Sequence, residues 1–334
     1  MEVVGKLTNN SMLRYCLLLS FLFVGCSTEH KKRPSKKEEK KQIIVPTFNS
    51  DSAYHFVQKQ VDFGPRALGS KGSKECAVFL KKTLIKYTPN VFVQEAPVTT
   101  YDNKKHILKN IIASFSPDKK NRIVLMAHWD TRPIADYDTE RKTEPILGAN
   151  DGGSGVAVLL ELARQFSVKE PSIGIDIVLF DAEDYGQPEN SSFPIMEDSW
   201  CLGSQYWANN PHVKNYYPRY GILLDMVGAE NATFTHEAVS RYYANNVLQK
   251  VWRQAHKLGF GNYFLFQDSK QILDDHYYVN IIANIPTIDI IEFDPSTETN
   301  FNKHWHTHKD DMNNIDKKTL MAVGQTLMHV IYNE

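Results

Sequence analysis

Cysteine is scarce in this sequence, with four residues among 334. Cys16 and Cys26 lie near the N-terminus, which leaves Cys76 and Cys201 for the rest of the chain. Two cysteines cannot build the disulfide framework that stabilises small secreted domains, so the fold depends on a hydrophobic core. The two remaining thiols either pair in an oxidising compartment or lie apart in the interior, and the sequence leaves both possibilities open.

An excess of charge of either sign is also missing. The chain has 38 Lys or Arg and 39 Asp or Glu, which gives a formal net charge of −1. Proteins that bind nucleic acid usually present a strongly basic surface, so nothing in the composition indicates a nucleic-acid partner. The charge is unevenly distributed, because residues 27–41 contain seven Lys or Arg and only three Glu.

The apolar run near the N-terminus is too short to cross a membrane, which takes about 20 residues. It covers ten residues, 15–24, follows Arg14 and has the length of a signal-peptide core. It ends in Gly25-Cys26, and a small residue before such a cysteine is typical of a bacterial lipoprotein processing site. We expect residues 1–26 to be a lipoprotein signal peptide and Cys26 to be acylated. A plain signal peptide with an incidental cysteine is the alternative.

This interpretation predicts the location of the protein and its domain organisation. A lipid on Cys26 would anchor the protein to a membrane of the bacterial cell envelope, on the periplasmic side or at the cell surface. Residues 27–47 are polar and lysine-rich, which predicts a flexible tether. Residues 48–334 contain no evident internal repeat and are expected to form one catalytic domain.

Helical and extended patterns alternate along this domain. Apolar periodicity predicts helices over 50–63, 73–87, 151–166, 201–209, 239–258, 274–282 and 316–332. Extended patterns lie over 91–94, 108–115, 122–127, 175–180, 221–224 and 287–291. Several of these strands are nearly continuous apolar runs, as expected for strands covered on both faces. The alternation predicts an α/β fold with a central, mostly parallel mixed sheet flanked by helices on both faces.

Acidic and imidazole side chains follow the carboxyl ends of the predicted strands. The set comprises His128, Asp130, Asp181, Glu183, Asp184, Asp225, Asp289 and Glu292. Ligands of open α/β sheets bind outside these strand ends, so the side chains are expected to line one crevice. So many carboxylates would repel one another, and a bound divalent cation would relieve that repulsion. The presence of histidine favours zinc over calcium or magnesium.

Each piece of this pattern also has a simpler explanation. Asp151, in the sequence Ala-Asn-Asp-Gly-Gly-Ser-Gly, would serve as a helix N-cap. Glu183 and Asp184 would fit a solvated turn, and the alternating histidines around His306 would fit a basic loop. Asp225 is harder to explain in this way, because a lone carboxylate directly after a buried strand is costly. The whole set therefore supports a metal site better than any single member does.

Five short motifs carry most of these residues. They are His128-Trp129-Asp130, Gly148-Ala-Asn-Asp151-Gly-Gly-Ser-Gly155, Asp181-Ala-Glu183-Asp184, Leu224-Asp225-Met226 and Trp305-His306-Thr307. In order and spacing they resemble the zinc-dependent aminopeptidase superfamily over about residues 63–311. Within it, the sequence is more similar to the animal-type and bacterial glutaminyl cyclases. The features behind that preference are Phe63-Gly-Pro-Arg66, Gly69-Ser70, Asp274-Asp275-His276 and Trp305 before the histidine.

The resemblance implies a role for each matching residue. Asp151, Asp184 and His306 would bind one zinc ion per chain. The animal enzymes carry a glutamate where this chain has Asp184, which leaves the coordination mode at this ligand open. The catalytic residues would be Glu183 as general base and acid, with Asp225 and Asp275 orienting the substrate amine or sharing its protons. The substrate-binding residues would be Trp305, Trp200 and His128.

The implied reaction is the conversion of N-terminal glutamine in peptides and proteins to pyroglutamate, with release of ammonia. Such a cyclisation brings no outside nucleophile, so one zinc ion suffices as a Lewis acid. A zinc aminopeptidase with a two-metal site is the alternative, because His128 and Asp225 leave a second metal position available. A binding module without activity is a third possibility, against which the intact Glu183 argues.

Overall fold

The computed structural model describes residues 43–334, which form one compact unit. The predicted signal peptide with Cys26, and most of the predicted tether, lie outside the described residues. The packed chain begins before residue 48: the carbonyl of Pro46 accepts from Gln325 at 3.3 Å, and that of Thr47 accepts from Gln165 at 3.0 Å. The last residues of the expected tether therefore belong to the folded body.

Helices and strands alternate along the described chain. The helices are α1 (Ser50–Val61), α2 (Lys71–Ile85), α3 (Ser154–Val168), α4 (Leu202–Asn209), α5 (Ala238–Lys257), α6 (Asp275–Ile281) and α7 (Lys317–Tyr332), with a 3-10 turn at Met312–Asn314. The strands are β1 (Val91–Thr99), β2 (Lys105–Phe115), β3 (Arg122–His128), β4 (Gly174–Phe180), β5 (Gly221–Asp225), β6 (Phe234–His236), β7 (Phe264–Asp268) and β8 (Thr287–Ile291).

The main sheet of the described part has six strands in the order β1-β2-β4-β3-β5-β8. β3 is parallel to β4 and β5, and β5 is parallel to β8. β2 is antiparallel to both of its neighbours, β1 and β4. The predicted mostly parallel mixed sheet is therefore confirmed. Because β3, β4, β5 and β8 run in one direction, their carboxyl ends meet at the same edge of the sheet.

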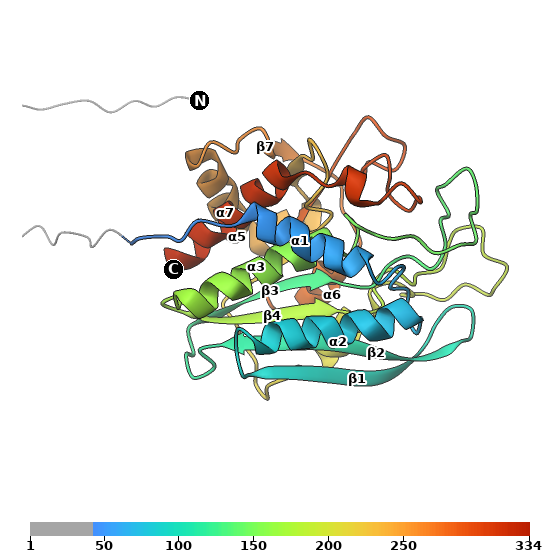
Figure 1. The fold of residues 1–334 in the computed structure, drawn as a ribbon, viewed down its shortest axis with the longest axis horizontal. Helices are drawn as coiled ribbons and strands as arrows, with labels where there is room; N and C mark the ends of the chain where they lie inside the picture. Colours follow the sequence, from blue (N-terminus) through green and yellow to red (C-terminus); the bar gives the residue numbers. More distant parts are fainter. Residues whose placement is uncertain (1–42) are drawn as a thin grey trace, which may run out of the picture. The chain divides into compact units, whose positions relative to one another are not determined.

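Helices cover both faces of this sheet, but unequally. α1, α2, α3, α5 and α7 share one large apolar core with the sheet, and Figure 1 shows α1, α2 and α3 in front of it. α4 and α6 pack on the opposite face through residues such as Trp207 and Val279. The start of α3 lies very close to β5, since a Cβ atom on Gly155 would come within 2.3 Å of the Leu224 carbonyl oxygen. This close approach brings the loop before α3 to the end of β5.

Some predicted elements differ from the observed ones. β1 extends to Thr99, further than its predicted end, with Pro97 in an edge strand where a proline is tolerated. β6 and β7 were not predicted, because β6 has only three residues and β7 is mostly exposed. α3 begins at Ser154 rather than at Asp151, so Asp151 lies in the preceding turn.

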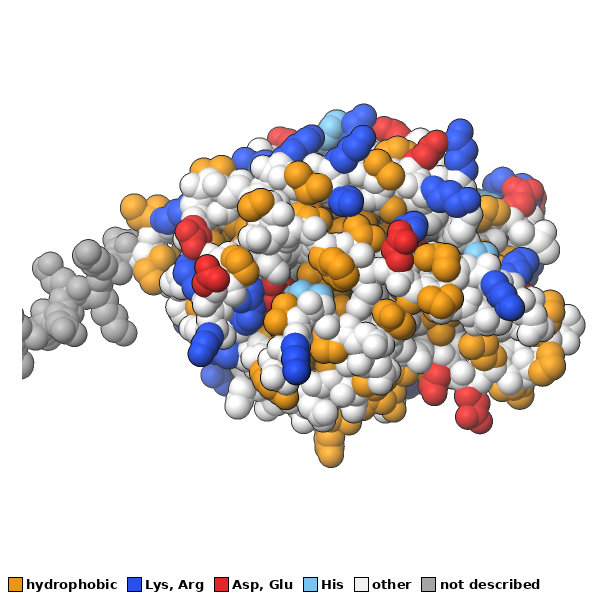
Figure 2. All heavy atoms as spheres, turned by 90° about the horizontal axis from the view of Figure 1, so that it is seen from below, with side chains coloured by type: hydrophobic (Ala, Val, Ile, Leu, Met, Phe, Trp, Pro, Cys, Tyr) orange, Lys and Arg blue, Asp and Glu red, His pale blue; other side chains and the backbone are white. Residues whose placement is uncertain are grey.

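The surface of the described part is mixed in character. Figure 2 shows charged side chains of both signs on the visible face, with hydrophobic side chains scattered among them. Among the helices of residues 43–334, none is both long enough and apolar enough to span a bilayer. Cys76 and Cys201 are both buried and free, which decides between the two alternatives left open for them.

An ion pair between the buried Asp176 and the largely buried Arg122 joins the ends of β3 and β4 that lie away from the carboxyl edge. Asp176 accepts from Arg122 Nε at 2.6 Å and from Nη2 at 2.8 Å, and also from Tyr216 Oη at 2.6 Å. Burial opposes ionisation of Asp176, but hydrogen bonds from His212, Arg122, Ser114 and Tyr216 outweigh it and lower its pKa. Asp176 is therefore charged and fully partnered in the folded protein.

Replacing Asp176 with asparagine should destabilise the fold by about 3 kcal/mol, because the Arg122 guanidinium would remain in the interior without its counter-charge. Urea unfolding of the two proteins measures the difference. Glu75→Gln is the matched control, since Glu75 pairs with Lys71 at the surface at 3.7 Å, and it should cost less than ~0.5 kcal/mol. Equal losses in the two variants would contradict the assigned role of Asp176.

Candidate active site

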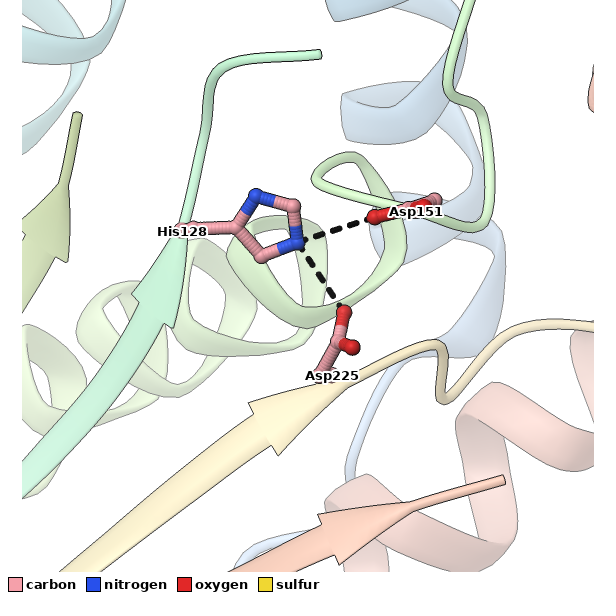
Figure 3. A group of neighbouring side chains, drawn as sticks. All are labelled: His128, Asp151 and Asp225. Atoms are coloured by element: carbon pink, nitrogen blue, oxygen red, sulfur yellow. Dashed lines mark hydrogen bonds and ion pairs between the residues drawn. The ribbon is translucent and has the colours of Figure 1, made fainter. Parts of the chain in front are cut away.

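A first group of possible metal ligands lies where β3 and β5 end. His128 is the last residue of β3, Asp225 is the last residue of β5, and Asp151 comes from the turn before α3. Figure 3 shows the three side chains pointing toward one another, with His128 Nε2 3.0 Å from Asp151 Oδ1 and 3.0 Å from Asp225 Oδ1. All three residues are buried.

A second group shares Asp151 with the first. It consists of Asp151, Asp184 and His306, each of which is buried and offers a ligand atom within 4.8 Å of the others. His306 Nε2 lies 3.0 Å from Asp184 Oδ1 and 3.6 Å from Asp151 Oδ2. The structure thus brings together the three residues predicted to hold zinc.

The donor set of the second group fits a zinc ion. One imidazole nitrogen and two carboxylates are typical zinc ligands. Asp184 Oδ2 is buried and has no hydrogen-bond partner within the described residues, as expected of an oxygen reserved for a cation. Burial, together with the charge of Asp151, raises the pKa of Asp184 to about 6, and a bound cation would offset this penalty.

A cavity of about 350 Å³ opens beside these groups. Its polar wall includes Glu183, Asp225 and Asp274. Its apolar wall consists largely of Trp200, Met226, Ile272, Leu273, Ile291, Phe293, Phe301 and Trp305. The predicted pocket residues Trp200 and Trp305 therefore both line the cavity, whereas His128 lies behind it among the metal-ligand candidates.

The two tryptophans enclose one of the candidate ligands. Trp305 stacks on His306 with ring centroids 3.7 Å apart, and Trp200 lies nearly parallel to the same imidazole at 6.1 Å. Tyr137 and Phe301 pack against Trp305 at 4.7 and 4.9 Å. The aromatic wall of the cavity is thus built onto the metal-ligand candidate His306.

Glu183 is the carboxylate best placed to act as a base. Burial raises its pKa well above the ordinary value, and Asp184, Asp274 and Asp275 raise it further against the opposing effect of His128. The Cys201 thiol donates to Glu183 Oε1 at 3.3 Å, which accounts for this buried cysteine. A carboxylate with a raised pKa on a cavity wall suits proton transfer near neutral pH.

The assignment of Asp275 to the substrate needs correction. Asp275 is fully buried and does not line the cavity, whereas its neighbour Asp274 does and lies within 4.8 Å of Glu183 and Cys201. Asp274 caps α6 in an extended conformation, and the chain then turns into the helix at Asp275. That change of backbone direction sends the two adjacent side chains to different places.

Two backbone turns that carry site residues adopt an unusual conformation. Ala182, directly before Glu183, has φ +58°, and His306 itself has φ +54°. Non-glycine residues rarely occupy this left-handed region, which costs of order 1–3 kcal/mol unless the surroundings enforce it. Asp130 helps to hold the turn at Ala182 in this conformation. Its two carboxylate oxygens accept hydrogen bonds from the backbone N–H of Glu183 at 3.0 Å and of Asp184 at 3.1 Å.

Several supporting residues could not be assigned such roles from the sequence. Arg66 is fully buried and donates to the carbonyls of Trp129, Leu147 and Gly148, which fixes the loop that leads to Asp151. Asp310 accepts from the backbone N–H of Asn150 at 2.8 Å and of Asp151 at 3.0 Å. The sequence shows only that each of these charged residues lies near a motif. It does not reveal which groups the side chain contacts.

Replacing Asp130 with asparagine should weaken zinc binding by roughly 10–100-fold, the usual effect of losing a group that orients ligands. The NH2 group of the asparagine would face one of the two backbone N–H groups, of Glu183 and Asp184, that donate to Asp130 in the wild type. That N–H group would lose its acceptor, and the position of Asp184 would no longer be fixed. Competition with a chelator measures the affinity. Asp62→Asn, at an exposed position, is the control and should leave the affinity unchanged. Unaltered affinity in Asp130→Asn would contradict the role assigned to this carboxylate.

The chain is similar to several known proteins. The family model described as peptidase family M28 matches residues 110–331. A crystal structure of a Zn-dependent exopeptidase from Parabacteroides distasonis is 51% identical with a TM-score of 0.85, and the match covers 87% of this chain and 100% of that chain. A crystal structure of glutaminyl cyclase from Tannerella forsythia is also 51% identical with a TM-score of 0.85, covering 86% of this chain and 100% of that one.

A more distant relative is the glutaminyl-peptide cyclotransferase of Bothrops jararaca, 26% identical over 246 residues, with 65% of this chain covered. The match spans 63% of that relative's length. These similarities confirm the resemblance inferred from the motifs, and the family together with the similar Zn-dependent exopeptidase points to zinc as the metal. The chain belongs to peptidase family M28.

Proposed function

We propose that the protein is a zinc-dependent glutaminyl-peptide cyclotransferase that converts N-terminal glutamine of peptides and proteins to pyroglutamate. The observation that carries this proposal is one small cavity lined by Glu183, Asp274 and two tryptophans, directly beside the His306 ligand group. The T. forsythia glutaminyl cyclase, matched over all of its own chain, supports the same activity.

Asp151, Asp184 and His306 would hold one zinc ion, which supplies a Lewis acid for the γ-carbonyl oxygen of the substrate glutamine. These three residues form a complete set of protein ligands for a catalytic zinc, which keeps one position open for substrate. We expect one zinc per chain, because cyclisation needs no metal-activated water.

Glu183 moves the proton that the reaction requires. The α-amine nitrogen of the substrate attacks the side-chain amide carbon, so a new C–N bond closes a five-membered ring. Glu183 accepts a proton from this amine and returns it to the departing amide nitrogen, which leaves as ammonia when the old C–N bond breaks. The raised pKa of Glu183 suits it to both halves of this transfer. Asp225 and Asp274, on the same cavity wall, are placed to accept hydrogen bonds from the N–H groups of the neutral amine.

The aromatic wall shapes the substrate for ring closure. An extended glutamine keeps its amine away from its side-chain amide, so the side chain must fold back before reaction. Trp200 and Trp305 confine one end of the cavity next to His306, and confinement of this kind lowers the entropic part of the barrier. The cavity volume of about 350 Å³ is at the lower end of small-molecule sites, in keeping with a single side chain as the occupant.

A two-metal aminopeptidase is the second candidate, and one observation favours it. Asp151 contributes to both ligand groups, so His128 and Asp225 could hold a second ion next to the first. A bridging carboxylate between two such groups is the arrangement of a two-metal hydrolase. In the cyclase, Asp225 would instead serve the substrate amine from the cavity wall, and His128, 3.0 Å from Asp225 and behind the cavity, would orient that carboxylate.

Three substrates separate the two candidates. The zinc-loaded protein should release ammonia from a peptide that begins with glutamine. A peptide that begins with asparagine and is otherwise identical should release none, because its shorter side chain would have to close a strained four-membered ring. A leucine anilide should remain uncleaved. If the protein cleaves the anilide and releases no ammonia from the glutamine peptide, the proposed cyclase function is wrong and the aminopeptidase function takes its place.

We also propose that the protein is a lipoprotein, attached through Cys26 to a membrane of the bacterial cell envelope. The support is the sequence alone, a signal-peptide core that ends in Gly25-Cys26. Metabolic labelling with radioactive palmitate should mark the wild-type protein and not a Cys26→Ala variant. Equal labelling of both proteins, or of neither, would contradict the lipid anchor.

A further inference from the structure

Arg132 is a buried arginine behind the aromatic wall of the cavity, four residues after the end of β3. Its side chain has no exposed surface, and its guanidinium carbon lies 4.4 Å from the centroid of the Trp200 ring. A guanidinium over the face of an indole is attracted by the ring electrons, most strongly where water is excluded. Arg132 therefore supports one face of the Trp200 indole.

The space between Trp200 and the backbone is filled closely. A Cβ atom on Gly186 would lie 1.9 Å from the Trp200 ring, so only glycine leaves room for the indole at this position. The same guanidinium holds this stretch of backbone: Arg132 Nη1 donates to the carbonyl of Gly186 at 2.7 Å and to that of Asp184 at 2.9 Å. One side chain thus fixes both the wall residue and the backbone of a zinc-ligand candidate.

Another contact of Arg132 leads to the other ligand. Its Nη2 donates to Asp136 Oδ2 at 2.7 Å, and Asp136 Oδ1 lies 3.2 Å from His306 Nδ1. A carboxylate on the outer nitrogen of a ligating histidine fixes the ring orientation and the tautomer. His306 in turn stacks parallel to Trp200, which closes a ring of contacts through Arg132, Asp136, His306 and Trp200.

We propose that Arg132 is a positioning residue that couples the substrate wall at Trp200 to the zinc ligands Asp184 and His306. Because Trp200 and Asp184 contact the Arg132 guanidinium directly and His306 is linked to it through Asp136, a displacement of the wall displaces the ligands, and the converse also holds. Coupling between two sites is reciprocal, so binding against the wall strengthens zinc binding to the extent that zinc strengthens binding at the wall. The identity of the substrate in this statement rests on the proposed cyclase function, but the coupling itself does not.

Lysine cannot replace Arg132 in this arrangement. A guanidinium is planar and presents several donors in fixed directions while one face remains free to stack. An ammonium group is a point charge that can reach Asp136 or the two carbonyls but cannot keep all of these contacts and the stacking on Trp200. Arg132→Lys should therefore lie between the wild type and Arg132→Met in every measurement.

The test is a double-mutant cycle with zinc affinity as the measured quantity, by chelator competition, on wild type, Arg132→Met, Trp200→Leu and the double variant. Arg132→Met should weaken zinc binding by ~10–100-fold. Trp200→Leu should weaken it by ~3-fold, and Arg132→Met should have a smaller effect in the Trp200→Leu background than in the wild type. At saturating zinc, Arg132→Met should also raise KM for a glutamine peptide more than it lowers kcat.

Arg122→Met is the matched control, because Arg122 is another largely buried arginine whose carboxylate partner, Asp176, lies far from the cavity edge. It should lower the melting temperature and leave zinc affinity unchanged. Unchanged zinc affinity in Arg132→Met, equal losses in Arg132→Met and Arg122→Met, or multiplicative effects in the cycle would each overturn the coupling. If Arg132→Met does not fold, the same double-mutant cycle is measured with Arg132→Lys in its place. The zinc affinities are measured without substrate turnover. A wild-type protein that releases no ammonia would therefore contradict the proposed function and leave the test of the coupling unaffected.

Discussion

Replacing Glu183 with glutamine should lower kcat by at least ~100-fold while the protein retains its zinc, because general acid–base catalysis contributes about 10²–10⁴-fold. Glutamine keeps the size and shape of the side chain but cannot accept the amine proton at neutral pH. Its position on the cavity wall next to Asp274, rather than within the His306 ligand group, predicts that the metal stays. Ammonia release and zinc content measured on one preparation give both quantities.

Glu189→Gln is the matched control for this experiment. Glu189 is exposed, and it undergoes the same chemical change without contact with the cavity. We expect its kcat to equal that of the wild type. Loss of zinc from Glu183→Gln would show that Glu183 is a ligand, and turnover within a few-fold of the wild type would show that another group moves the proton.

His306→Ala should remove the zinc, whereas His128→Ala should leave the metal content unchanged. His306 belongs to the ligand group assigned to zinc, so its loss should weaken zinc binding by more than ~100-fold, beyond the effect of removing an orienting group alone. His128 belongs to the other group, and its loss should leave one zinc per chain in place. Both are buried imidazoles that contact Asp151, which makes the comparison well matched.

Metal analysis of the wild type and both variants after dialysis checks this prediction. The wild type and His128→Ala should each contain one zinc, and His306→Ala should contain almost none. Two zinc ions in the wild type and one in His128→Ala would instead place a second ion at His128 and Asp225. That result would favour the aminopeptidase over the cyclase.

The location of the site could be predicted from the sequence because it follows from the sheet. β3, β4 and β5 are apolar runs with clear ends, and parallel strands place those ends at one edge. His128, Glu183 and Asp225 come directly at or after such ends, so their proximity follows from strand order. Asp151 and His306 come from loops, and only the resemblance to known zinc enzymes assigned them, with Asp184, to one zinc ion.

The finer geometry could not be predicted, because it depends on backbone turns and on buried contacts between distant segments. Asp274 and Asp275 are identical neighbours, and only the extended conformation of Asp274 decides which of them lines the cavity. Arg132 is 68 positions from Trp200 in the sequence, yet the two side chains stack. Neither contact leaves a periodic or compositional signal.

The most direct test of the central claim uses a peptide with ¹⁵N in the side-chain amide of its N-terminal glutamine. After incubation with the zinc-loaded protein, the account predicts labelled ammonia and a peptide of full length that has lost the mass of one labelled ammonia molecule. Its N-terminus should be blocked to sequential degradation. Free glutamine that still carries the label, together with a peptide shortened by one residue, would contradict cyclisation and establish cleavage in its place.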